Sequence, residues 1–183
     1  MIELKGLVKQ FGDLIAVDGI DLVVPKGEFF AVLGPNAAGK TTTIKMMVGL
    51  IKPTHGSAVV AGYDIQQNPL KARERLAYVP DFPFLYEKLT PLEFMRFTGQ
   101  LFKIDPDRVR TEGEQLAKRF HLETFLHKPI EGLSHGTRQR VAISIGSSKR
   151  IPVAVYYQPF KYVIGTRNSD DLIVQRGRVI LNR

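Results

Sequence analysis

Residues 34–42 read GPNAAGKTT, and this stretch decides the fold. It fits the pattern Gly-x-x-x-x-Gly-Lys-Ser/Thr, in which successive backbone N–H groups form a concave nest for phosphate. Residues 29–33 (FFAVL), directly before it, form the short apolar run that is typical of a strand buried on both faces. The apolar residues after it recur with helical spacing, at Ile44, Met47, Val48 and Ile51. Strand, loop and helix in this order predict a phosphate-binding P-loop.

The chemistry of this loop lies in a few residue types. Lys40 would bring a mobile positive charge to the β- and γ-phosphates, and the Thr41 hydroxyl is placed for Mg²⁺. Ala37 stands where a further glycine could sit, and alanine there costs about 1 kcal/mol if the position needs a positive φ angle. The motif alone is compatible with a kinase, a GTPase or a transport ATPase.

Composition limits the remaining possibilities. The chain has 183 residues, 44% of them hydrophobic and 24% charged, which is ordinary for one globular domain with or without an insert. The absence of cysteine excludes disulfides, a thiol nucleophile and cysteine-bound metals. No stretch approaches the roughly 20 apolar residues that span a bilayer, and the start lacks the apolar run of a signal peptide. We therefore expect a chain that does not cross a membrane by itself, although it could dock on a protein that does.

The rest of the chain predicts a strand-rich frame with a helical insert. Strand character is expected at residues 2–8, 14–24, 57–65, 76–80, 153–157 and 171–181. Residues from about 82 to 146 have helical character instead. Three helix starts are marked there, by the capping box Thr90-Pro91-Leu92-Glu93, by Asp105-Pro106 and by Leu133-Ser134.

A second motif separates the nucleotide-binding classes. Residues 133–140 read LSHGTRQR at the start of a predicted helix, and residues 78–90 read YVPDFPFLYEKLT. Together with GPNAAGKTT, these stretches resemble the ATP-binding subunit of ABC transporters, whose signature motif is similar to the Leu-Ser-x-Gly…Gln-Arg block. The resemblance runs from residue 2 to about 146 and resumes at 170–180, which looks like the family's closing β-hairpin. The SHG form and the PFLYEKLT stretch indicate the exporter (ABC-2-like) branch.

The resemblance implies an α/β fold. A P-loop NTPase core with a parallel sheet would carry an N-terminal antiparallel β part and an inserted α-helical subdomain. The implied domains are residues 1–81 for the ATP-binding core with its P-loop, and residues 82–146 for the helical subdomain ending in the signature motif. Residues 147–183 would be the remainder of the core, which is shortened and atypical.

The resemblance also implies site residues for ATP and Mg²⁺. Phe11 would stack on the adenine, although a phenylalanine of the core is the alternative. The signature residues Ser134, His135 and Gly136 would meet the γ-phosphate of an ATP held by a second copy, in a head-to-tail dimer. The residues expected around the phosphates are Gly34, Asn36, Ala37, Ala38, Gly39, Lys40, Thr41 and Thr42.

Partners follow from the same resemblance. A transmembrane permease subunit would contact residues 82–97, for which an ordinary amphipathic surface is the alternative, and a homo- or heterodimer of ATP-binding subunits would form. The protein would then lie in the cytoplasm, on the inner face of the cell membrane. Residues 132–183 carry nine Lys/Arg against only two acids, Asp170 and Asp171. No aromatic-and-basic stacking platform accompanies this charge, so no nucleic acid is expected and a nucleic-acid-associated P-loop protein is the least favoured reading.

The sequence departs from the family at the residues that would break the phosphate bond. Asp81 replaces a glutamine that contacts Mg²⁺ and the attacking water, and it could either bind Mg²⁺ or be a solvated loop acid. The family ends the corresponding apolar strand with Asp-Glu-Pro, whereas this chain has Tyr157, Gln158 and Pro159 after VAVY (153–156). Gln158 stands at the general-base position and cannot take a proton. The chain is therefore either a transport ATPase or a degenerate module that binds ATP without hydrolysing it.

A length difference accompanies these substitutions. Only residues 159–170 separate Gln158 from Asp171, where the family has a helix and a further strand. We therefore expect the parallel sheet to lack one strand.

Overall fold

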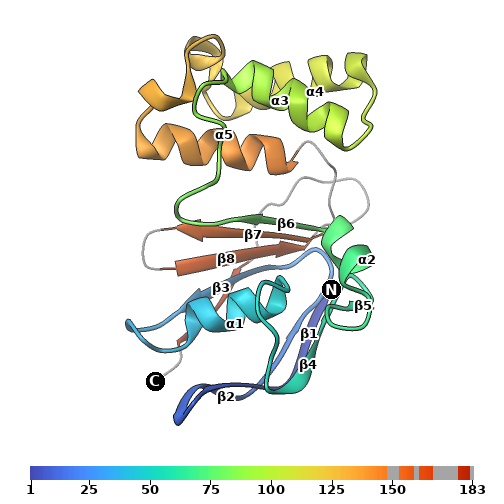
Figure 1. Ribbon diagram of the computed structural model, residues 1–183, viewed down its shortest axis with the longest axis vertical. Helices are drawn as coiled ribbons and strands as arrows, with labels where there is room; N and C mark the ends of the chain where they lie inside the picture. Colours follow the sequence, from blue (N-terminus) through green and yellow to red (C-terminus); the bar gives the residue numbers. More distant parts are fainter. Residues whose placement is uncertain (148–152, 159–160, 167–176, 182–183) are drawn as a thin grey trace. The chain divides into compact units, whose positions relative to one another are not determined.

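The structure, a computed structural model, describes residues 1–147, 153–158, 161–166 and 177–181. The chain divides into two compact units, one comprising Met1–Tyr78 and Ile151–Arg183 and the other Val79–Arg150. Both are traced in Figure 1. Among these described residues, the first unit holds two sheets and two helices, and the second unit is helical. The predicted α/β fold class is confirmed.

The first sheet of the first unit is antiparallel and comes from the N-terminal part of the chain. Its strand order is β2-β1-β4-β5. Strands β1 and β2 form a hairpin in which Phe11 faces Leu14. The strands are β1 (Ile2–Phe11), β2 (Leu14–Val24), β4 (His55–Val60) and β5 (Tyr63–Asp64), which confirms the strands expected there.

The second sheet has the strand order β6-β7-β8-β3-β9. Strand β3 runs parallel to β9 and antiparallel to β8, and β8 is antiparallel to β7 as well. The sheet is thus mixed rather than uniformly parallel. Its strands are β3 (Phe29–Leu33), β6 (Leu76–Val79), β7 (Val153–Gln158), β8 (Lys161–Thr166) and β9 (Gly177–Leu181).

Strand β8 corrects the expectation of a missing strand. It lies between β7 and β3, in a segment that showed only an atypical pattern. Only two residues separate Gln158 from Lys161. A link of that length can join antiparallel strands, whereas parallel neighbours need a crossover of about a dozen residues or more. The short segment therefore fills the sheet with a strand of reversed direction. Of the predicted closing hairpin, only β9 lies within the described residues; 170–176 lie outside them.

The helices of the first unit differ slightly from expectation. Helix α1 (Lys40–Met47) ends before the predicted stripe reaches Ile51, because Gly49 adopts a left-handed φ of 73° that stops the helix. Helix α2 (Pro69–Glu74) was not anticipated, although Pro69 at its first position is a helix-start signal.

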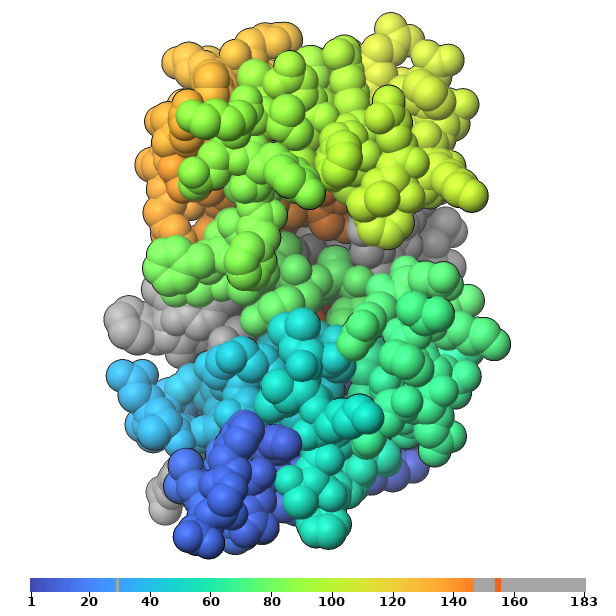
Figure 2. Space-filling view, in the orientation of Figure 1, coloured from blue at the N-terminus to red at the C-terminus, as the bar shows by residue number. Residues whose placement is uncertain are grey.

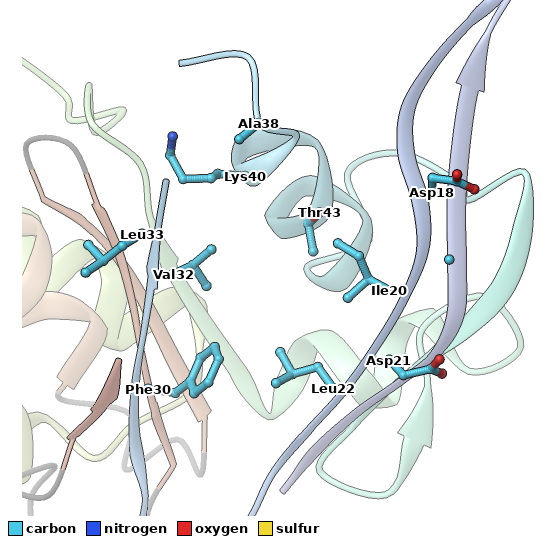
Figure 3. A pocket seen from close by; sticks show the side chains of 11 residues that line it. Asp18, Ile20, Asp21, Leu22, Phe30, Val32, Leu33, Ala38, Lys40 and Thr43 are labelled. Carbon is cyan, nitrogen blue, oxygen red and sulfur yellow. The ribbon is translucent and has the colours of Figure 1, made fainter. Parts of the chain in front are cut away.

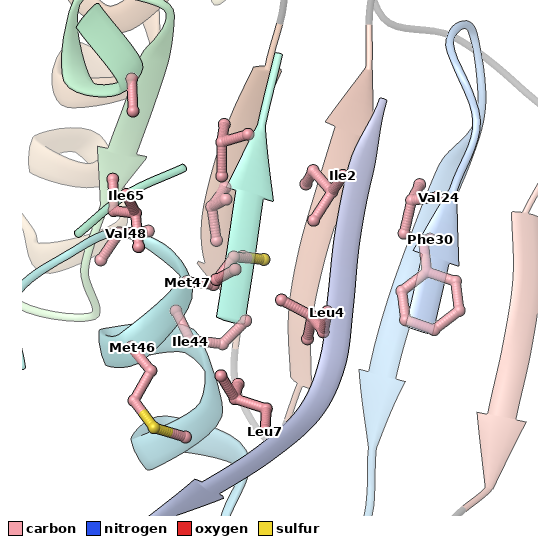
Figure 4. Close-up of a cluster of buried hydrophobic side chains, with 14 of the residues drawn as sticks. Ile2, Leu4, Leu7, Val24, Phe30, Ile44, Met46, Met47, Val48 and Ile65 are labelled. Carbon is pink, nitrogen blue, oxygen red and sulfur yellow. The ribbon is translucent and has the colours of Figure 1, made fainter. Parts of the chain in front are cut away.

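The core of the first unit holds α1 on the antiparallel sheet. Ile2, Leu4 and Leu7 of β1 are at most 1% exposed. Ile44, Met46 and Met47 of α1 are buried to the same degree and belong to the same cluster. Figure 4 shows these side chains gathered with Val24 and Phe30. The helix that follows the P-loop is therefore fixed by apolar contacts on its sheet-facing side.

The second unit is built from helices around its own apolar cluster. Phe94, Met95, Leu122, Ile130 and Val141 lie at its centre. All three predicted helix starts are confirmed, with capping side chains from Thr90, Asp105 and Ser134. The elements are α3 (Pro91–Leu101), α4 (Pro106–Arg119), η1 (Glu123–Phe125), η2 (Ile130–Gly132) and α5 (His135–Ser147).

Within the described residues, no helix is both long enough and apolar enough to cross a bilayer.

The capping box at the start of α3 gives a stability prediction. The Thr90 hydroxyl accepts from the Glu93 N–H at 3.2 Å, and the Glu93 carboxylate accepts from the Thr90 N–H at 2.8 Å. Thr90→Ala removes the cap and should lower the free energy of unfolding by about 1 kcal/mol at pH 7. Denaturant titration would measure this, with Thr90→Ser expected to keep most of the stability. Equal stabilities of Thr90→Ala and the wild type would contradict the role of the cap.

The capping box also determines how the stability of the protein changes with pH. The hydrogen bond from the Thr90 backbone N–H, followed by that from its hydroxyl, holds the pKa of the Glu93 carboxyl below its ordinary value. A lowered folded-state pKa stabilises the protein above the unfolded-state pKa, and this stabilisation is lost as the pH falls through the folded-state pKa. Thr90→Ala keeps the backbone N–H but loses the hydroxyl, so the hydroxyl's share of this stabilisation should disappear from the difference between wild type and variant in acid.

Candidate functional site

The phosphate-binding loop is closed on itself by the lysine that follows it. Helix α1 begins at Lys40, after Gly39 with a left-handed φ of 76°. The Lys40 ammonium donates to the carbonyl oxygens of Gly34 at 2.6 Å and Pro35 at 2.5 Å. Its charge is thus held at the loop by groups that a bound anion can replace. The loop lies at the surface of the first unit, among the light-blue residues in Figure 2.

Gly39 is the tightest point of the loop. A Cβ atom there would lie 2.5 Å from the Ala16 carbonyl oxygen and 3.1 Å from a methyl carbon of Val17. The Gly39 carbonyl also accepts from the Thr43 N–H at 2.8 Å and the Thr43 hydroxyl at 3.0 Å. The loop is therefore in backbone contact with β2 at a position where only glycine fits.

Ala37 has a φ of 65°, so the position does require the left-handed conformation. The cost of alanine expected from the sequence depends on a positive φ at this position. Because φ is positive, alanine costs the loop about 1 kcal/mol there.

A hollow of about 850 Å³ opens over the loop. Its size lies within the range of pockets for small molecules and cofactors, about 300–1,000 Å³. Phe11 contributes to its wall and is 49% exposed, with the Lys9 ammonium 4.9 Å from its ring centre. The alternative of a core phenylalanine is therefore excluded. The structure brings together in this hollow every residue expected to bind ATP: Phe11, Gly34, Asn36, Ala37, Ala38, Gly39, Lys40, Thr41 and Thr42.

A smaller hollow of about 330 Å³ lies behind the loop and shares Ala38 and Lys40 with it. Figure 3 shows Ile20 and Leu22 of β2 facing Phe30 and Val32 of β3 across this space. Its walls are mainly apolar, so it is unsuited to phosphate.

The signature residues lie in the second unit, at the start of α5. Ser134, His135 and Gly136 are all exposed. The Ser134 hydroxyl oxygen accepts from the Thr137 N–H at 3.3 Å and lies 2.9 Å from the Thr137 hydroxyl oxygen. The positive end of the helix dipole and the exposed N–H groups of its first turn suit an anion.

Asp81 has specific partners rather than bulk solvent alone. Its carboxylate lies 3.4 Å from Nε2 of His135. The Gln139 amide donates to the Asp81 carbonyl at 3.1 Å and to its carboxylate at 3.4 Å. The loop acid is therefore tied to the signature helix, a contact that neither sequence alternative included.

Sequence reasoning missed the residues that hold this helix start in place. The Arg138 guanidinium donates to the carbonyls of Leu133 at 3.1 Å and Glu131 at 2.7 Å, and to the Glu87 carboxylate at 3.0 Å. The available signal was the Arg-Gln-Arg run at the end of the LSHGTRQR block.

The ligands suited to Mg²⁺ are the Thr41 hydroxyl and a carboxylate such as Asp81, because Mg²⁺ prefers oxygen. Thr41 lies in the hollow over the loop, whereas Asp81 belongs to the other unit. Among the described residues, no three His, Asp or Glu side chains gather closely enough to hold a metal ion by themselves. The oxygen chemistry at Thr41 fits Mg²⁺ only together with oxygens from a nucleotide phosphate.

The expected hydrolytic position is placed by its backbone. Gln158 is the last residue of β7, opposite Lys161, and Tyr157 lies opposite Tyr162. Pro159 lies outside the described residues. A tyrosine and a glutamine thus occupy the strand end where the resemblance implies an aspartate and a glutamate.

These features define a nucleotide-binding P-loop protein whose helical unit carries a Leu-Ser-x-Gly motif. Comparison with known families gives the narrower class. The sequence pattern described as "ABC transporter" matches residues 17–159, which is more than half of the chain. The chain belongs to this family.

Individual relatives agree with this assignment. The chain is 38% identical over 147 residues to the probable multidrug ABC transporter ATP-binding protein YbhF of Escherichia coli K12, covering 79% of this chain and 25% of that protein. It is 33% identical over 144 residues to the Nod factor export ATP-binding protein I of Cupriavidus metallidurans, covering 79% and 48%. The chain thus spans a quarter and about half of these relatives' lengths.

A solved structure supports the fold. The dimeric ATP-binding cassette MJ0796, bound to ADP and Pi in a post-hydrolysis state, is 27% identical with a TM-score of 0.75. The match covers 87% of this chain and 74% of that one. The suspected resemblance to ABC transporter ATP-binding proteins is therefore confirmed.

Two single substitutions in the loop should act in opposite directions. Gly39→Ala places a methyl group against the Ala16 carbonyl in a left-handed conformation, so it should destabilise the first unit and weaken ATP binding by about tenfold or more. Ala37→Gly removes the cost of the positive φ and should raise the free energy of unfolding by up to about 1 kcal/mol. Urea denaturation and titration of a fluorescent ATP analogue would measure both. Equal effects of the two substitutions would show that the loop does not have this backbone conformation.

Proposed function

We propose that this chain is the ATP-binding subunit of an ABC-type transporter and couples ATP to export through a membrane partner. The observation that carries the proposal is the hollow over the loop, where Lys40 is held by two carbonyl oxygens that phosphate can replace. Family membership and the names of the two relatives, one multidrug and one export protein, support the transport role and its direction.

Each part of ATP would meet a different part of the hollow. The adenine would stack on the exposed ring of Phe11, and the N–H groups from Asn36 to Thr42 would surround the phosphates. Lys40 would move from its carbonyl partners to the β- and γ-phosphates. Mg²⁺, when bound, would neutralise charge on these phosphates, and the Thr41 hydroxyl would hold it. The Asp81 carboxylate, whose Oδ1 atom contacts His135 and Gln139, would be the second protein ligand of this ion.

The signature residues would act on a nucleotide held by another subunit. Ser134 and Gly136 are exposed at a helix start that suits phosphate, and the similar MJ0796 structure is a dimer. A head-to-tail pair, with a second copy or a related subunit, would place these residues on the γ-phosphate.

A surface for the permease is available in the second unit. Phe82 is 74%, Phe84 96% and Tyr86 59% exposed, and the Tyr86 ring packs edge-on against Phe94 and Phe97. Exposed aromatic side chains grouped along one segment are typical of an interaction site. Residues 82–97 would thus bind a transmembrane partner at the inner face of the membrane, and we expect no nucleic acid.

Hydrolysis is a separate question, for which one observation favours a second candidate function. Gln158 ends β7 where a general base is needed, and glutamine cannot accept a proton. The chain would then bind ATP, pair with another subunit and release phosphate slowly, as a degenerate module of the same family.

Binding can be tested with two lysine substitutions on one helix. Lys40→Ala should weaken the affinity for a fluorescent ATP analogue by about tenfold or more, because a charge-assisted contact to phosphate is lost. Lys45→Ala changes an exposed lysine on the same helix and should leave the affinity unchanged. Unchanged binding in Lys40→Ala would refute the assignment of the hollow.

Turnover can be tested by restoring the acids. A phosphate-release assay on the double variant Tyr157→Asp with Gln158→Glu should show a rate about 10²-fold or more above that of the wild type. Fast release by the wild type would instead mean that another group supplies the base. Wild-type binding without release would favour the degenerate module.

A further inference from the structure

Arg140 links the end of one helix to the start of another. Its guanidinium donates from one nitrogen to the carbonyls of Phe120 at 3.0 Å and His121 at 3.1 Å, at the end of α4. The other terminal nitrogen donates to the Thr137 hydroxyl oxygen at 3.1 Å. A guanidinium can only donate, so the direction of each of these hydrogen bonds is fixed.

The hydrogen bond from Arg140 to Thr137 also determines the direction of the bond between the Thr137 and Ser134 hydroxyls. Thr137 is 5% exposed, so its hydroxyl proton needs an acceptor within the protein. Among the residues that the structure describes, the acceptor in contact with this hydroxyl is the Ser134 oxygen at 2.9 Å. If Ser134 donated instead, the Thr137 proton would be buried without an acceptor. Thr137 therefore donates and Ser134 accepts.

The Ser134 oxygen is then saturated as an acceptor. It receives the Thr137 hydroxyl and the Thr137 backbone N–H, which occupy its two lone pairs. Its own proton is the group that remains, and Ser134 is exposed. The hydroxyl can therefore offer a proton to a ligand but cannot accept one from it.

We propose that Thr137 and Arg140 are positioning residues that make Ser134 a pre-oriented hydrogen-bond donor. A ligand that accepts hydrogen bonds, such as a phosphate oxygen, matches this site, whereas an ammonium group or a metal cation meets no lone pair on it. The proposal rests on the proposed function in one respect: the matching acceptor is taken to be the γ-phosphate of an ATP held by another subunit. The orientation itself follows from Arg140 and Thr137 alone.

The orientation can be measured on the full chain without nucleotide. Three-bond NMR couplings of the Ser134 side chain should report one χ1 rotamer in the wild type. Thr137→Val keeps the branched shape and the backbone N–H bond to Ser134 but removes the hydroxyl, so the couplings should move from those of one rotamer toward the average over staggered rotamers. Thr137→Ser restores the hydroxyl and should return the single rotamer. Unchanged couplings in Thr137→Val, or averaged couplings in the wild type, would overturn the proposal.

The consequence can be measured by sedimentation with ATP and Mg²⁺. Ser134→Ala should weaken ATP-dependent self-association by about tenfold or more, since a bond to a charged group is lost. Thr137→Val should weaken it by up to about threefold, the cost of selecting one of three rotamers when that selection is lost completely, and should leave monomer binding of a fluorescent ATP analogue unchanged. In the Ser134→Ala background, Thr137→Val should have no further effect, because its influence passes through the serine. Thr111→Val, an exposed threonine on α4, should match the wild type.

The two readouts separate the inference from the function on which it rests. If Ser134→Ala weakens association but Thr137→Val does not, the positioning role is wrong and the dimer stands. If the wild type does not self-associate with ATP while its Ser134 rotamer is single and depends on Thr137, the orientation stands and the homodimeric function is wrong. An equal loss for Thr137→Val with and without Ser134 would show a merely structural role and would overturn the inference.

Discussion

The contact between Gly39 and the backbone of Ala16 is the constraint on which the binding region depends. A side chain at Gly39 would overlap the Ala16 carbonyl, so the loop can approach β2 only with glycine there. This approach brings the loop and the β1–β2 hairpin together, which places Phe11 in the same hollow as Lys40. Burial of Ile44 and Met47 then holds α1, and with it the loop, on the antiparallel sheet.

Features encoded by neighbouring residues were predictable from the sequence. The strand at 29–33, the loop at 34–42 and the capping box at Thr90 each depend on residues a few positions apart, and the structure has all of them. Prediction failed where a distant residue or a link length decides the outcome. Strand β8 takes its direction from the two-residue link after Gln158, a constraint that a resemblance to longer sequences obscures.

The same distinction explains the candidate site. The ATP-binding residues cluster because they are consecutive, apart from Phe11, whose exposure separates it from a core residue. The sequence could not decide whether Asp81 is a Mg²⁺ ligand or a solvated loop acid, because its partners His135 and Gln139 lie more than fifty positions away in the sequence. Arg140 and Thr137 were overlooked for a similar reason, since the end of α4 that fixes Arg140 is not adjacent to the signature motif.

Phosphate binding and phosphate-bond cleavage make different demands on a chain. Binding needs one short loop and the positive end of one helix, and both are encoded within residues 34–47. Bond cleavage also needs a general base at a defined distance, which the family resemblance places at the end of another strand, so it depends on the order and direction of the strands in the sheet. A change confined to the segment around β7 and β8 can therefore remove cleavage and leave phosphate binding intact. The end of β7 has the features expected of a chain that binds ATP without hydrolysing it. Tyr157 and Gln158 stand there, next to a strand of reversed direction.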